Sequence, residues 1–328
     1  MPTPVDKKRV TALFFRRVGD SLMATPALRA VKRRTPGVTL TVVAGKHVAR
    51  VFEFNPWIDH MVTVKSAPSV LRLAAAARQH GRPDVVLDFL SDPRSALATM
   101  LSGASERIGF AYPWRWHAYT TRVALQDTAH PVYSAIHKLK MAAALGAEET
   151  DYATDFYLSA DDHEFAAAAW QERGWSADSA VCAFFVHSRR SQKRWPLGAF
   201  CELICRLEKE GAGIPLVLVT PGDESAVSEL RARACLHAQN VLTITDLGRL
   251  GAVLSRCRVL IGNDGGPKHI AVALNVPTVT VFPTGSAAFW TPPAAELHLA
   301  LAPSVAGGGV EPSLVYEAAL TSLRSPRR

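Results

Sequence analysis

Residues 263–269 (NDGGPKH) combine a carboxylate, two adjacent glycines and two basic side chains directly after an apolar run. Gly265 and Gly266 would let the backbone approach a ligand closely, and the N–H groups of a following helix start would attract an anion. The segment therefore predicts a phosphate or diphosphate site, in which Asp264 holds a hydroxyl or orients the amides. The alternative is an ordinary glycine turn in which Asn263 or Asp264 caps the helix.

A second polar segment, residues 187–200 (HSRRSQKRWPLGAF), also follows an apolar run. Lys193 and Arg194 place two cations just before a predicted helix, where they could counter the charge of a departing diphosphate. The alternative is a solvated basic loop in which Trp195 packs as an anchor. A third segment, residues 220–230 (TPGDESAVSEL), offers carboxylates that could accept hydrogen bonds from a ribose, or an N-cap at Asp223.

The fourth segment, residues 16–30 (RRVGDSLMATPALRA), is the only one of the four in the first half of the chain. Gly19 predicts a tight turn after the first strand, and Asp20 is expected at the exit of that strand. An ionised carboxylate there could take a proton from an incoming hydroxyl. The alternative is that Asp20 only caps the next helix. The sequence contains no GxGxxG, so a dinucleotide-dependent dehydrogenase is poorly supported.

Strands that end at one edge of a sheet are needed to position these four segments. Short β-branched runs alternate with helical patterns along most of the chain, which predicts parallel sheets covered by helices on both faces. The predicted strands are 9–15, 38–45, 60–65, 83–90, 180–187, 214–220, 241–245, 258–264 and 277–282. The predicted helices are 26–34, 47–54, 69–80, 197–210, 224–234, 247–257, 268–275 and 312–324.

The length of 328 residues exceeds what one compact core usually holds, which favours two domains of roughly 150 residues. We predict an N-terminal domain over 1–165, a C-terminal domain over 166–310, and a last helix within 311–328 that packs back on the N-terminal domain. The fold prediction is α/β, with two Rossmann-like parallel sheets facing a central ligand cleft.

Composition excludes several classes of protein. No apolar run approaches the ~20 residues that span a bilayer, and the N-terminal run breaks at Arg16 without a signal-peptide cleavage pattern. The five cysteines are odd in number and form no CxxC pair, which favours reduced thiols over disulfides or a structural zinc. The net charge of +8 attracts anions, but no nucleic-acid-binding signature accompanies it, so we expect no nucleic-acid partner.

Three blocks of the sequence resemble glycosyltransferase family nine, the heptosyltransferases of lipopolysaccharide core assembly. They are RRVGDSLMATPALRAVKRRTPGVTLTVVAGKHVARVFEFNPWIDHMV near the N-terminus, QKRWP in the centre, and VLIGNDGGPKHIAVALNVPTVTVFPT. The first block is the most specific, and the resemblance covers nearly the whole chain.

This resemblance implies a GT-B fold and an inverting transfer of heptose from ADP-heptose, with no metal and no cofactor. The donor would bind the C-terminal domain and a lipid-linked core oligosaccharide would bind the N-terminal one. Asp20 falls on the family's general base and Lys193 on the lysine that contacts donor phosphate. Glu224 most nearly matches the carboxylate that holds the ribose. The donor loop would comprise Asp264, Gly265, Gly266 and His269.

Two segments depart from the family pattern. Gly265 stands where the family usually has a serine or threonine. The loop before QKRWP reads HSRRS, with Ser188 and Ser191 as its only hydroxyl residues, and Arg189 and Arg190 are expected to substitute as cations beside Arg194. These departures affect the identity of the donor more than the fold, so another nucleotide sugar stays open as the donor.

The acceptor side is expected to be basic. The residues expected to flank it are Arg16, Arg17, Lys32, Arg33 and Arg34. Four more would join it if the intervening loops cover the cleft: Arg94, Arg107, Arg115 and Arg122. Such charge suits an anionic membrane surface, which predicts a cytoplasmic enzyme at the inner face of the inner membrane. The aromatic stretch 109–122 could meet sugars or membrane, or pack as an ordinary loop. A sugar-nucleotide epimerase or hydrolase and a non-catalytic anion binder remain alternatives.

Overall fold

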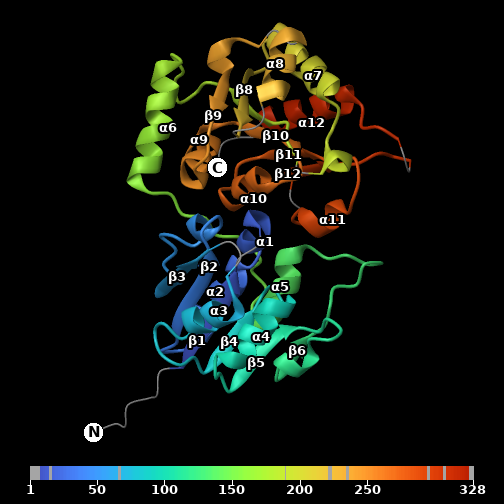
Figure 1. Cartoon of the computed structure of the whole chain (residues 1–328). Coiled ribbons are helices and arrows are strands. Elements are labelled where there is room, and N and C mark those ends of the chain that lie inside the picture. Colours follow the sequence, from blue (N-terminus) through green and yellow to red (C-terminus); the bar gives the residue numbers. More distant parts are fainter. Residues whose placement is uncertain are drawn as a thin grey trace. The chain divides into compact units, whose positions relative to one another are not determined.

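The computed structural model describes residues 8–14, 17–65, 68–188, 190–220, 224–233, 236–293, 296–305 and 308–324 (Figure 1). Its contacts divide the chain into two compact units, Met1–Tyr157 and Leu158–Arg328. The sequence-based boundary at 165 would fall inside helix α6 (Ala160–Glu172). Because α6 packs along α9 (Leu247–Arg256), the whole helix belongs to the second unit.

The first unit contains a six-stranded parallel sheet in the order β3-β2-β1-β4-β5-β6. The connections leave β1 in one direction and β4 in the other, so the crevice between these two neighbours is the topological switch point where α/β folds bind ligands. The strands are β1 (Arg9–Phe14), β2 (Thr39–Gly45), β3 (His60–Val64), β4 (Val85–Asp88), β5 (Glu106–Phe110) and β6 (Thr121–Val123).

Helices cover both faces of this sheet. Helices α2 (Thr25–Arg34) and α5 (Ser134–Ala143) pack on each other, and α3 (Val70–Ala77) packs on α4 (Pro93–Leu101). The remaining elements are α1 (Val18–Leu22) and two 3-10 turns, η1 (Ala49–Val51) and η2 (Trp116–Ala118). Because both faces are covered, β1 is buried at every position after Arg9.

The predicted helix over 47–54 is wrong, since only the 3-10 turn η1 forms there. Phe54 has a left-handed φ of 59°, which an α-helix cannot accommodate, and Pro56 follows two residues later.

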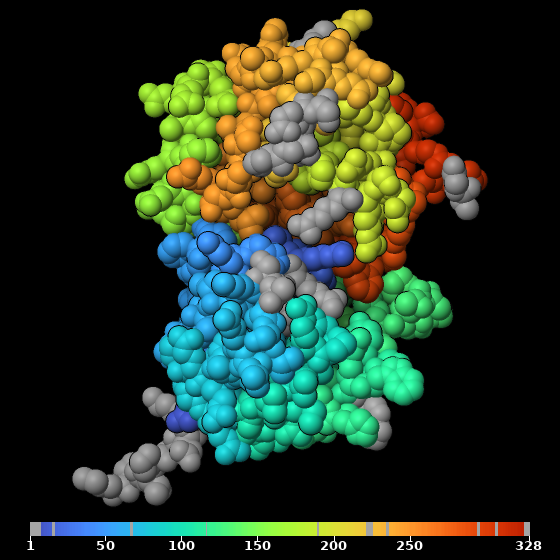
Figure 2. All heavy atoms as spheres, viewed as in Figure 1, coloured from blue at the N-terminus to red at the C-terminus, as the bar shows by residue number. Residues whose placement is uncertain are grey.

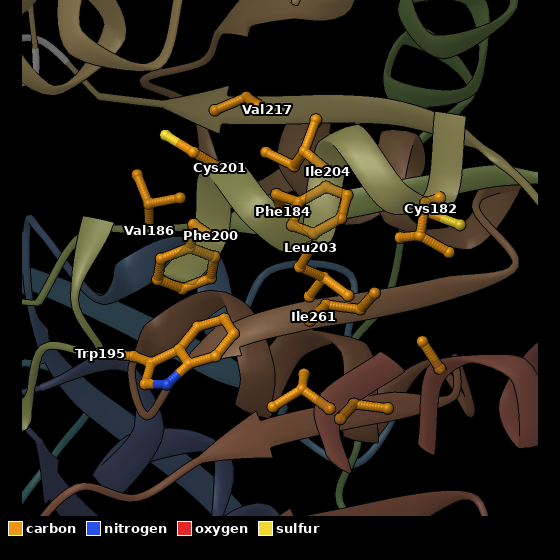
Figure 3. Packing of buried hydrophobic residues seen from close by; sticks show 14 of the residues in the cluster. Cys182, Phe184, Val186, Trp195, Phe200, Cys201, Leu203, Ile204, Val217 and Ile261 are labelled. Atoms are coloured by element: carbon orange, nitrogen blue, oxygen red, sulfur yellow. The ribbon is translucent and has the colours of Figure 1, made fainter. Parts of the chain in front are cut away.

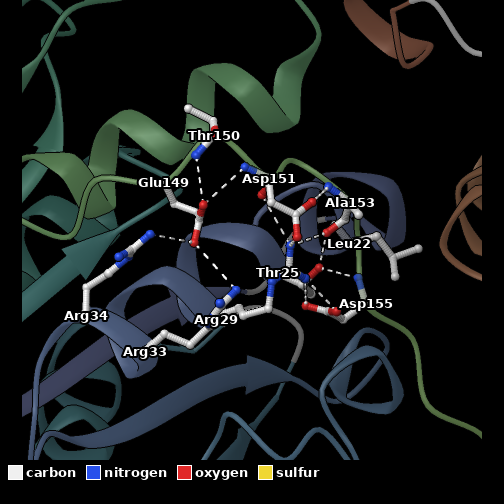
Figure 4. Close-up of polar contacts among 10 residues, drawn as sticks. All are labelled: Leu22, Thr25, Arg29, Arg33, Arg34, Glu149, Thr150, Asp151, Ala153 and Asp155. Atoms are coloured by element: carbon white, nitrogen blue, oxygen red, sulfur yellow. Dashed lines mark hydrogen bonds and ion pairs between the residues drawn. The ribbon is translucent and has the colours of Figure 1, made fainter.

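The end of the first unit is tied to helix α2 by a group of ion pairs (Figure 4). Arg29 is 6% exposed and donates to both carboxylate oxygens of Asp155 at 2.6 Å. Arg33 and Arg34 each lie 3.6 Å from Oε2 of Glu149.

Lys32, in the same turn of α2, donates to Asp59 at 2.7 Å. Lys32, Arg33 and Arg34 stand at the end of α2 that leads into β2, away from the strand exits. The structure therefore places Lys32, Arg33 and Arg34 at the other edge of the sheet from Asp20.

The second unit repeats the first topology, with a six-stranded parallel sheet in the order β12-β11-β10-β7-β8-β9. Its switch point lies between β7 and β10. The strands are β7 (Val181–Phe185), β8 (Ile214–Val219), β9 (Val241–Thr243), β10 (Val259–Asn263), β11 (Thr278–Val281) and β12 (His298–Leu301).

The core of the second unit lies between this sheet and helices α7 (Leu197–Lys209) and α12 (Pro312–Arg324). Figure 3 shows Trp195 and Phe200 at one end of it, with ring centroids 4.7 Å apart. Helix α12 contacts α7, β10 and β11, so it belongs to the second unit. The other elements are α8 (Glu224–Arg233), α10 (Gly266–Ala273), α11 (Ala287–Trp290), η3 (Ser191–Lys193) and η4 (Ala238–Asn240).

Each of the nine predicted strands is present, with small differences at the ends. The strands β5, β6 and β12 were not predicted because they are short or start with polar residues. Within the described ranges, no helix combines the length and the apolar character needed to cross a bilayer.

Candidate functional site

Asp264 follows β10 at the switch point of the second sheet and faces three basic side chains. Its Oδ2 accepts a hydrogen bond from Nζ of Lys193 at 2.9 Å. Its Oδ1 lies 3.6 Å from Nζ of Lys268 and 3.7 Å from Nε2 of His269. The Asp264 side chain is 9% exposed, so this group of charges is largely shielded from solvent. We call these four residues the Asp264 cluster.

Burial and neighbouring charge act on this cluster in opposite directions. Burial alone would raise the pKa of Asp264, but Lys268, His269 and Lys193 together bring that pKa below its ordinary value. Burial lowers the pKa of Lys268 to about 8, although Asp264 opposes the shift. The Lys268 ammonium also donates to the carbonyl of Trp290 and, at 3.2 Å, to Oγ1 of Thr291.

Asn263 fixes the loop that carries Lys193. Its Nδ2 donates to the carbonyl of Val186 at 2.7 Å, and its Oδ1 accepts from the backbone N–H of Trp195 at 2.8 Å. This one buried amide therefore joins the exit of β7 to the far end of the loop. Helix α10 has no side-chain cap, so the alternative in which Asn263 or Asp264 caps it is wrong.

The other predicted donor residues of this loop have different exposures. Ser188 is 7% exposed and its carbonyl accepts from Nε of Arg194 at 2.6 Å, which closes the loop. Ser191 begins the turn η3 and is exposed, as is Arg194. Arg189 lies outside the described residues. Trp195 is buried and donates from Nε1 to the carbonyl of Val310 at 2.8 Å, so the anchoring role proposed for it is confirmed.

Trp290 lies beside the Asp264 cluster. The Lys193 ammonium lies 5.6 Å from its ring centroid, and the ring of His269 lies 6.0 Å from it. Thr284 donates to the carbonyl of Gln192 at 2.9 Å, which joins this region to the Lys193 loop. An aromatic face and a fixed ammonium therefore stand together next to the helix start.

Gly265 forms the N-cap of α10 and Gly266 is its first residue. A Cβ atom at Gly265 would come within 3.3 Å of Cε1 of Phe185, a residue at the end of β7. The Phe185 ring thus takes space that a serine or threonine side chain would need. This contact gives a steric reason for the departure from the family pattern.

Glu224, the predicted ribose carboxylate, is the first residue of α8. Its side chain and residues 221–223 lie outside the described residues, so the predicted capping role of Asp223 lies outside them as well.

Asp20 stands at the switch point of the first sheet, where α1 follows β1. Its side chain is 39% exposed, and Oδ1 lies 3.6 Å from Nζ of Lys138. Lys138 is buried in α5 and donates to Oγ of Ser134 at 2.7 Å. Burial lowers the pKa of Lys138, and Asp20 opposes that shift.

Two expectations about this segment were wrong. Gly19 lies inside the helix α1, and not in a turn. The N-cap of α1 is Arg17 and no side chain caps the helix, so Asp20 is not a capping residue. Among the residues that the structure describes, the Asp20 carboxylate therefore has one fixed ammonium beside it and an open, solvent-accessible side.

The predicted acceptor arginines stand on three different elements. Arg17 is exposed at the start of α1, and Arg94 is exposed at the start of α4. Arg115 donates to the carbonyl of Ser91 at 2.6 Å, so part of its guanidinium braces a loop. Arg16 lies outside the described residues.

Sequence reasoning missed Asn263 as a loop anchor and both buried lysines, Lys138 and Lys268. Each lysine had a detectable signal, because it occupies a position that faces the core in its helical pattern. Lys138 lies three residues after Ala135 and three before Met141, and Lys268 lies three residues before Ala271, all of them buried. A lysine at such a position is buried only when it has partners.

Comparison with known proteins agrees with these observations. The family model described as "Glycosyltransferase family 9 (heptosyltransferase)" matches residues 71–304. The chain belongs to glycosyltransferase family 9. The resemblance seen in the sequence is thereby confirmed, and the protein is a glycosyltransferase.

Among relatives of this family 9 enzyme, lipopolysaccharide heptosyltransferase 3 of Escherichia coli K12 is 24% identical over 293 residues, covering 84% of this chain and 82% of that protein. A family 9 glycosyltransferase structure from Veillonella parvula covers 98% of both chains with a TM-score of 0.85 at 21% identity. The E. coli ADP-heptose lps heptosyltransferase II structure has a TM-score of 0.77 at 19% identity, covering 96% of this chain and 98% of that one. The predicted GT-B fold, with two Rossmann-like sheets, is confirmed.

Proposed function

We propose that this family 9 glycosyltransferase moves a heptosyl group from ADP-heptose to a hydroxyl of the lipopolysaccharide inner core, with inversion and without a metal. The Asp264 cluster at the β7–β10 switch point carries the proposal. Its one carboxylate faces two ammonium groups beside the start of α10, so a dianionic leaving group would find a surplus of positive charge there. The names of the relatives support the choice of heptose and ADP.

In the proposed reaction, the acceptor oxygen attacks the anomeric carbon while the bond from that carbon to the diphosphate oxygen breaks. The electron pair of the broken bond stays on the ADP leaving group, and the proton of the acceptor hydroxyl passes to the Asp20 carboxylate. Attack from the side opposite the leaving group inverts the anomeric carbon. The donor contains its own leaving group, so no nucleophilic protein residue is needed.

Fixed cations and backbone N–H groups of the second unit would stabilise the departing ADP. Lys193 would shift from Asp264 Oδ2 toward the diphosphate, because both are anions competing for one ammonium. The backbone N–H groups at Gly265 and Gly266 would bind the same phosphates. Cations and amides held in place supply the charge stabilisation that a metal supplies in other transferases. Ser188, Ser191, Arg194, Glu224 and His269 complete the proposed donor site.

Asp20 suits the role of base because its carboxylate is open to solvent on one side and fixed on the other. Lys138, 3.6 Å away, holds the carboxylate in position. A general base contributes about 10²- to 10⁴-fold in rate. The acceptor is proposed to bind the first unit near Arg17, Arg94 and Arg115, at the inner face of the inner membrane.

Donor identity is tested by thermal-shift titration of the full chain with ADP, UDP, GDP and CDP in the presence of EDTA. A ligand that binds only the native state at 100 times its Kd stabilises it by about 2.7 kcal/mol. We expect a rise in Tm with ADP alone. Selective stabilisation by UDP or GDP would overturn ADP-heptose as the donor, and no shift with any nucleotide would overturn the donor site itself.

The reaction is tested with ADP-heptose and truncated core oligosaccharides, with the product linkage determined by NMR. We expect one heptose added and the anomeric configuration inverted. A product that retains the configuration would contradict a single displacement with Asp20 as base. Release of free heptose without transfer, at every acceptor tested, would favour hydrolysis.

A further inference from the structure

Helices α3 and α4 expose an apolar surface where a covering helix normally exposes polar side chains. Leu97, Met100 and Leu101 are 45%, 46% and 46% exposed, and their spacing places them on one face of α4. The opposite face of α4 is buried against the sheet and its neighbours through Ser95, Ala96, Ala98 and Thr99. Leu71, on the adjacent α3, is 73% exposed. Figure 2 shows the open surface over these helices, in light blue to cyan.

The same surface is basic. Arg72, Arg78 and Arg94 are exposed on or at the end of these two helices, and neither α3 nor α4 contains an aspartate or glutamate. Within the ranges that the structure describes, none of these three arginine side chains makes an ion pair. We call this surface, with the four apolar side chains above, the α3–α4 face.

Trp114 extends the α3–α4 face from the neighbouring loop. It is 94% exposed and has a left-handed φ of 67°, a conformation that costs a bulky residue energy. The loop around it is nevertheless braced, because Arg115 donates to the Ser91 carbonyl at 2.6 Å and stacks 5.0 Å from the Tyr112 ring. Contacts between α4 and η2 hold this loop beside α4.

We propose that the α3–α4 face and Trp114 dock this protein on an anionic lipid bilayer. Leucine and methionine side chains would enter the interfacial layer, arginines would pair with lipid phosphates, and tryptophan suits the boundary between them. A second copy of the chain fits less well, because a two-fold interface would set this face against itself and bring arginines together.

The topology makes docking at this face useful for a lipid-linked acceptor. Helix α4 starts where β4 ends, and β4 pairs with β1, whose exit leads to Asp20. The α3–α4 face therefore begins at the same edge of the sheet as Asp20. The docking proposal does not depend on which nucleotide sugar is the donor.

The test is flotation of the full chain with phosphatidylcholine vesicles and with vesicles of phosphatidylcholine and phosphatidylglycerol in equal parts. We expect binding to the mixed vesicles only, weakened by salt. The double substitution Leu97→Gln/Met100→Gln should lower the partition coefficient about ten-fold or more. Arg72→Gln and Arg78→Gln should each lower it about five-fold, the equivalent of about 1 kcal/mol.

Two further variants keep the experiment interpretable. Leu314→Gln, in α12, is the matched control, since Leu314 is 49% exposed in the second unit and should not affect binding. Trp114→Gly retains the left-handed backbone and should abolish a vesicle-induced shift in tryptophan fluorescence. The thermal shift with ADP verifies that each variant is folded and binds donor.

Equal binding by the α3–α4 variants and the wild type would overturn the proposal. So would an absence of binding to anionic vesicles by a wild-type chain that still responds to ADP. A dimer in solution that dissociates on Leu97→Gln/Met100→Gln would assign the face to a second copy instead. Loss of the ADP response with vesicle binding intact would count against the proposed function and leave the docking proposal standing.

Discussion

Asp20 and Asp264 both lie at the switch point of a sheet, in two units of the same topology, but Asp20 follows the first strand of its unit and Asp264 the fourth. Each follows a central strand at a switch point, β1 in one case and β10 in the other, and each faces a lysine buried in a nearby helix. Asp20 is 39% exposed and has one ammonium neighbour at 3.6 Å. Asp264 is 9% exposed and has three basic neighbours, one of them at 2.9 Å.

The difference in exposure and in the number of basic neighbours suits the two carboxylates to different roles. Asp264 has a lowered pKa and is enclosed by cations, so it is poorly placed to accept a proton and well placed to hold Lys193 and the start of α10. Asp20 has an open side that an acceptor hydroxyl can reach. The comparison predicts that loss of Asp20 affects proton transfer alone, whereas disruption of the Asp264 cluster affects donor binding.

The largest expected effect is that of Asp20→Ala. We expect the rate of heptose transfer to fall about 1,000-fold, because the general base is lost, while the Kd for ADP is unchanged. The measurement is single-turnover transfer together with calorimetric titration of ADP. Asp20→Asn, which keeps the shape of the side chain, is the matched variant and should be as inactive. Weaker ADP binding with transfer preserved would reverse the roles assigned to the two carboxylates.

Lys193→Ala is expected to slow transfer about 100-fold and to weaken ADP binding in the same experiment. The variant removes a phosphate contact and leaves Oδ2 of Asp264 without its 2.9 Å donor. Gln192→Ala is the control, because Gln192 is exposed in the same turn and contributes only its carbonyl to Thr284. Unchanged kinetics in Lys193→Ala would remove this lysine from the donor site.

Lys268→Met is expected to lower the free energy of unfolding at pH 7 by about 2 kcal/mol. The substitution leaves the Trp290 carbonyl and Thr291 without their donor, but Asp264 keeps Lys193 and His269. A stability unchanged at pH 7 would mean that the buried ammonium contributes nothing net to the fold.

The pH dependence of the same variant sharpens this prediction. Burial lowers the pKa of Lys268 to about 8 in the folded protein, below its ordinary value of 10.5, so the unfolded chain binds more protons between those values. Stability of the wild type should therefore rise with pH in this window, by at most about 1.4 kcal/mol per pH unit. Chemical denaturation at several pH values checks whether Lys268→Met lacks this slope.

Lys138→Met is expected to lower kcat about ten-fold, with the Kd for ADP unchanged. Lys138 does not touch the reacting atoms; it positions Asp20 from 3.6 Å away. Methionine fills a similar volume in the buried register of α5, so the fold should be retained. Lys138→Arg should recover part of the rate, and a loss of stability without a change in kcat would make Lys138 a structural residue only.

The sequence was sufficient to predict where the polar segments lie, since continuous apolar strands fix the parallel sheets and strand exits define one edge of each. It could not show how differently the Asp20 and Asp264 carboxylates are enclosed, because both residues lie between a buried strand and a helix. The distinction depends on Lys138 and Lys268, whose places beside the two carboxylates only the packed structure defines. The same reason explains why the sequence offered Asn263 only as an alternative helix cap and not as the anchor of the Lys193 loop.

The smallest expected effect concerns Gly265, where this chain lacks the hydroxyl residue usual in its family. A serine there would place its Cβ 3.3 Å from Cε1 of Phe185, so the ring must move by a few tenths of an ångström. We expect Gly265→Ser alone to weaken ADP binding about three-fold, because this strain and the new hydrogen bond nearly offset each other.

The double variant Gly265→Ser/Phe185→Leu separates the two contributions to that small effect. Leucine removes the ring edge, so the serine hydroxyl should reach the diphosphate and bring the Kd for ADP to or below the wild-type value. Phe185→Leu alone is the control for lost packing at the end of β7. If the double variant binds ADP no better than Gly265→Ser, the Phe185 ring does not explain the glycine.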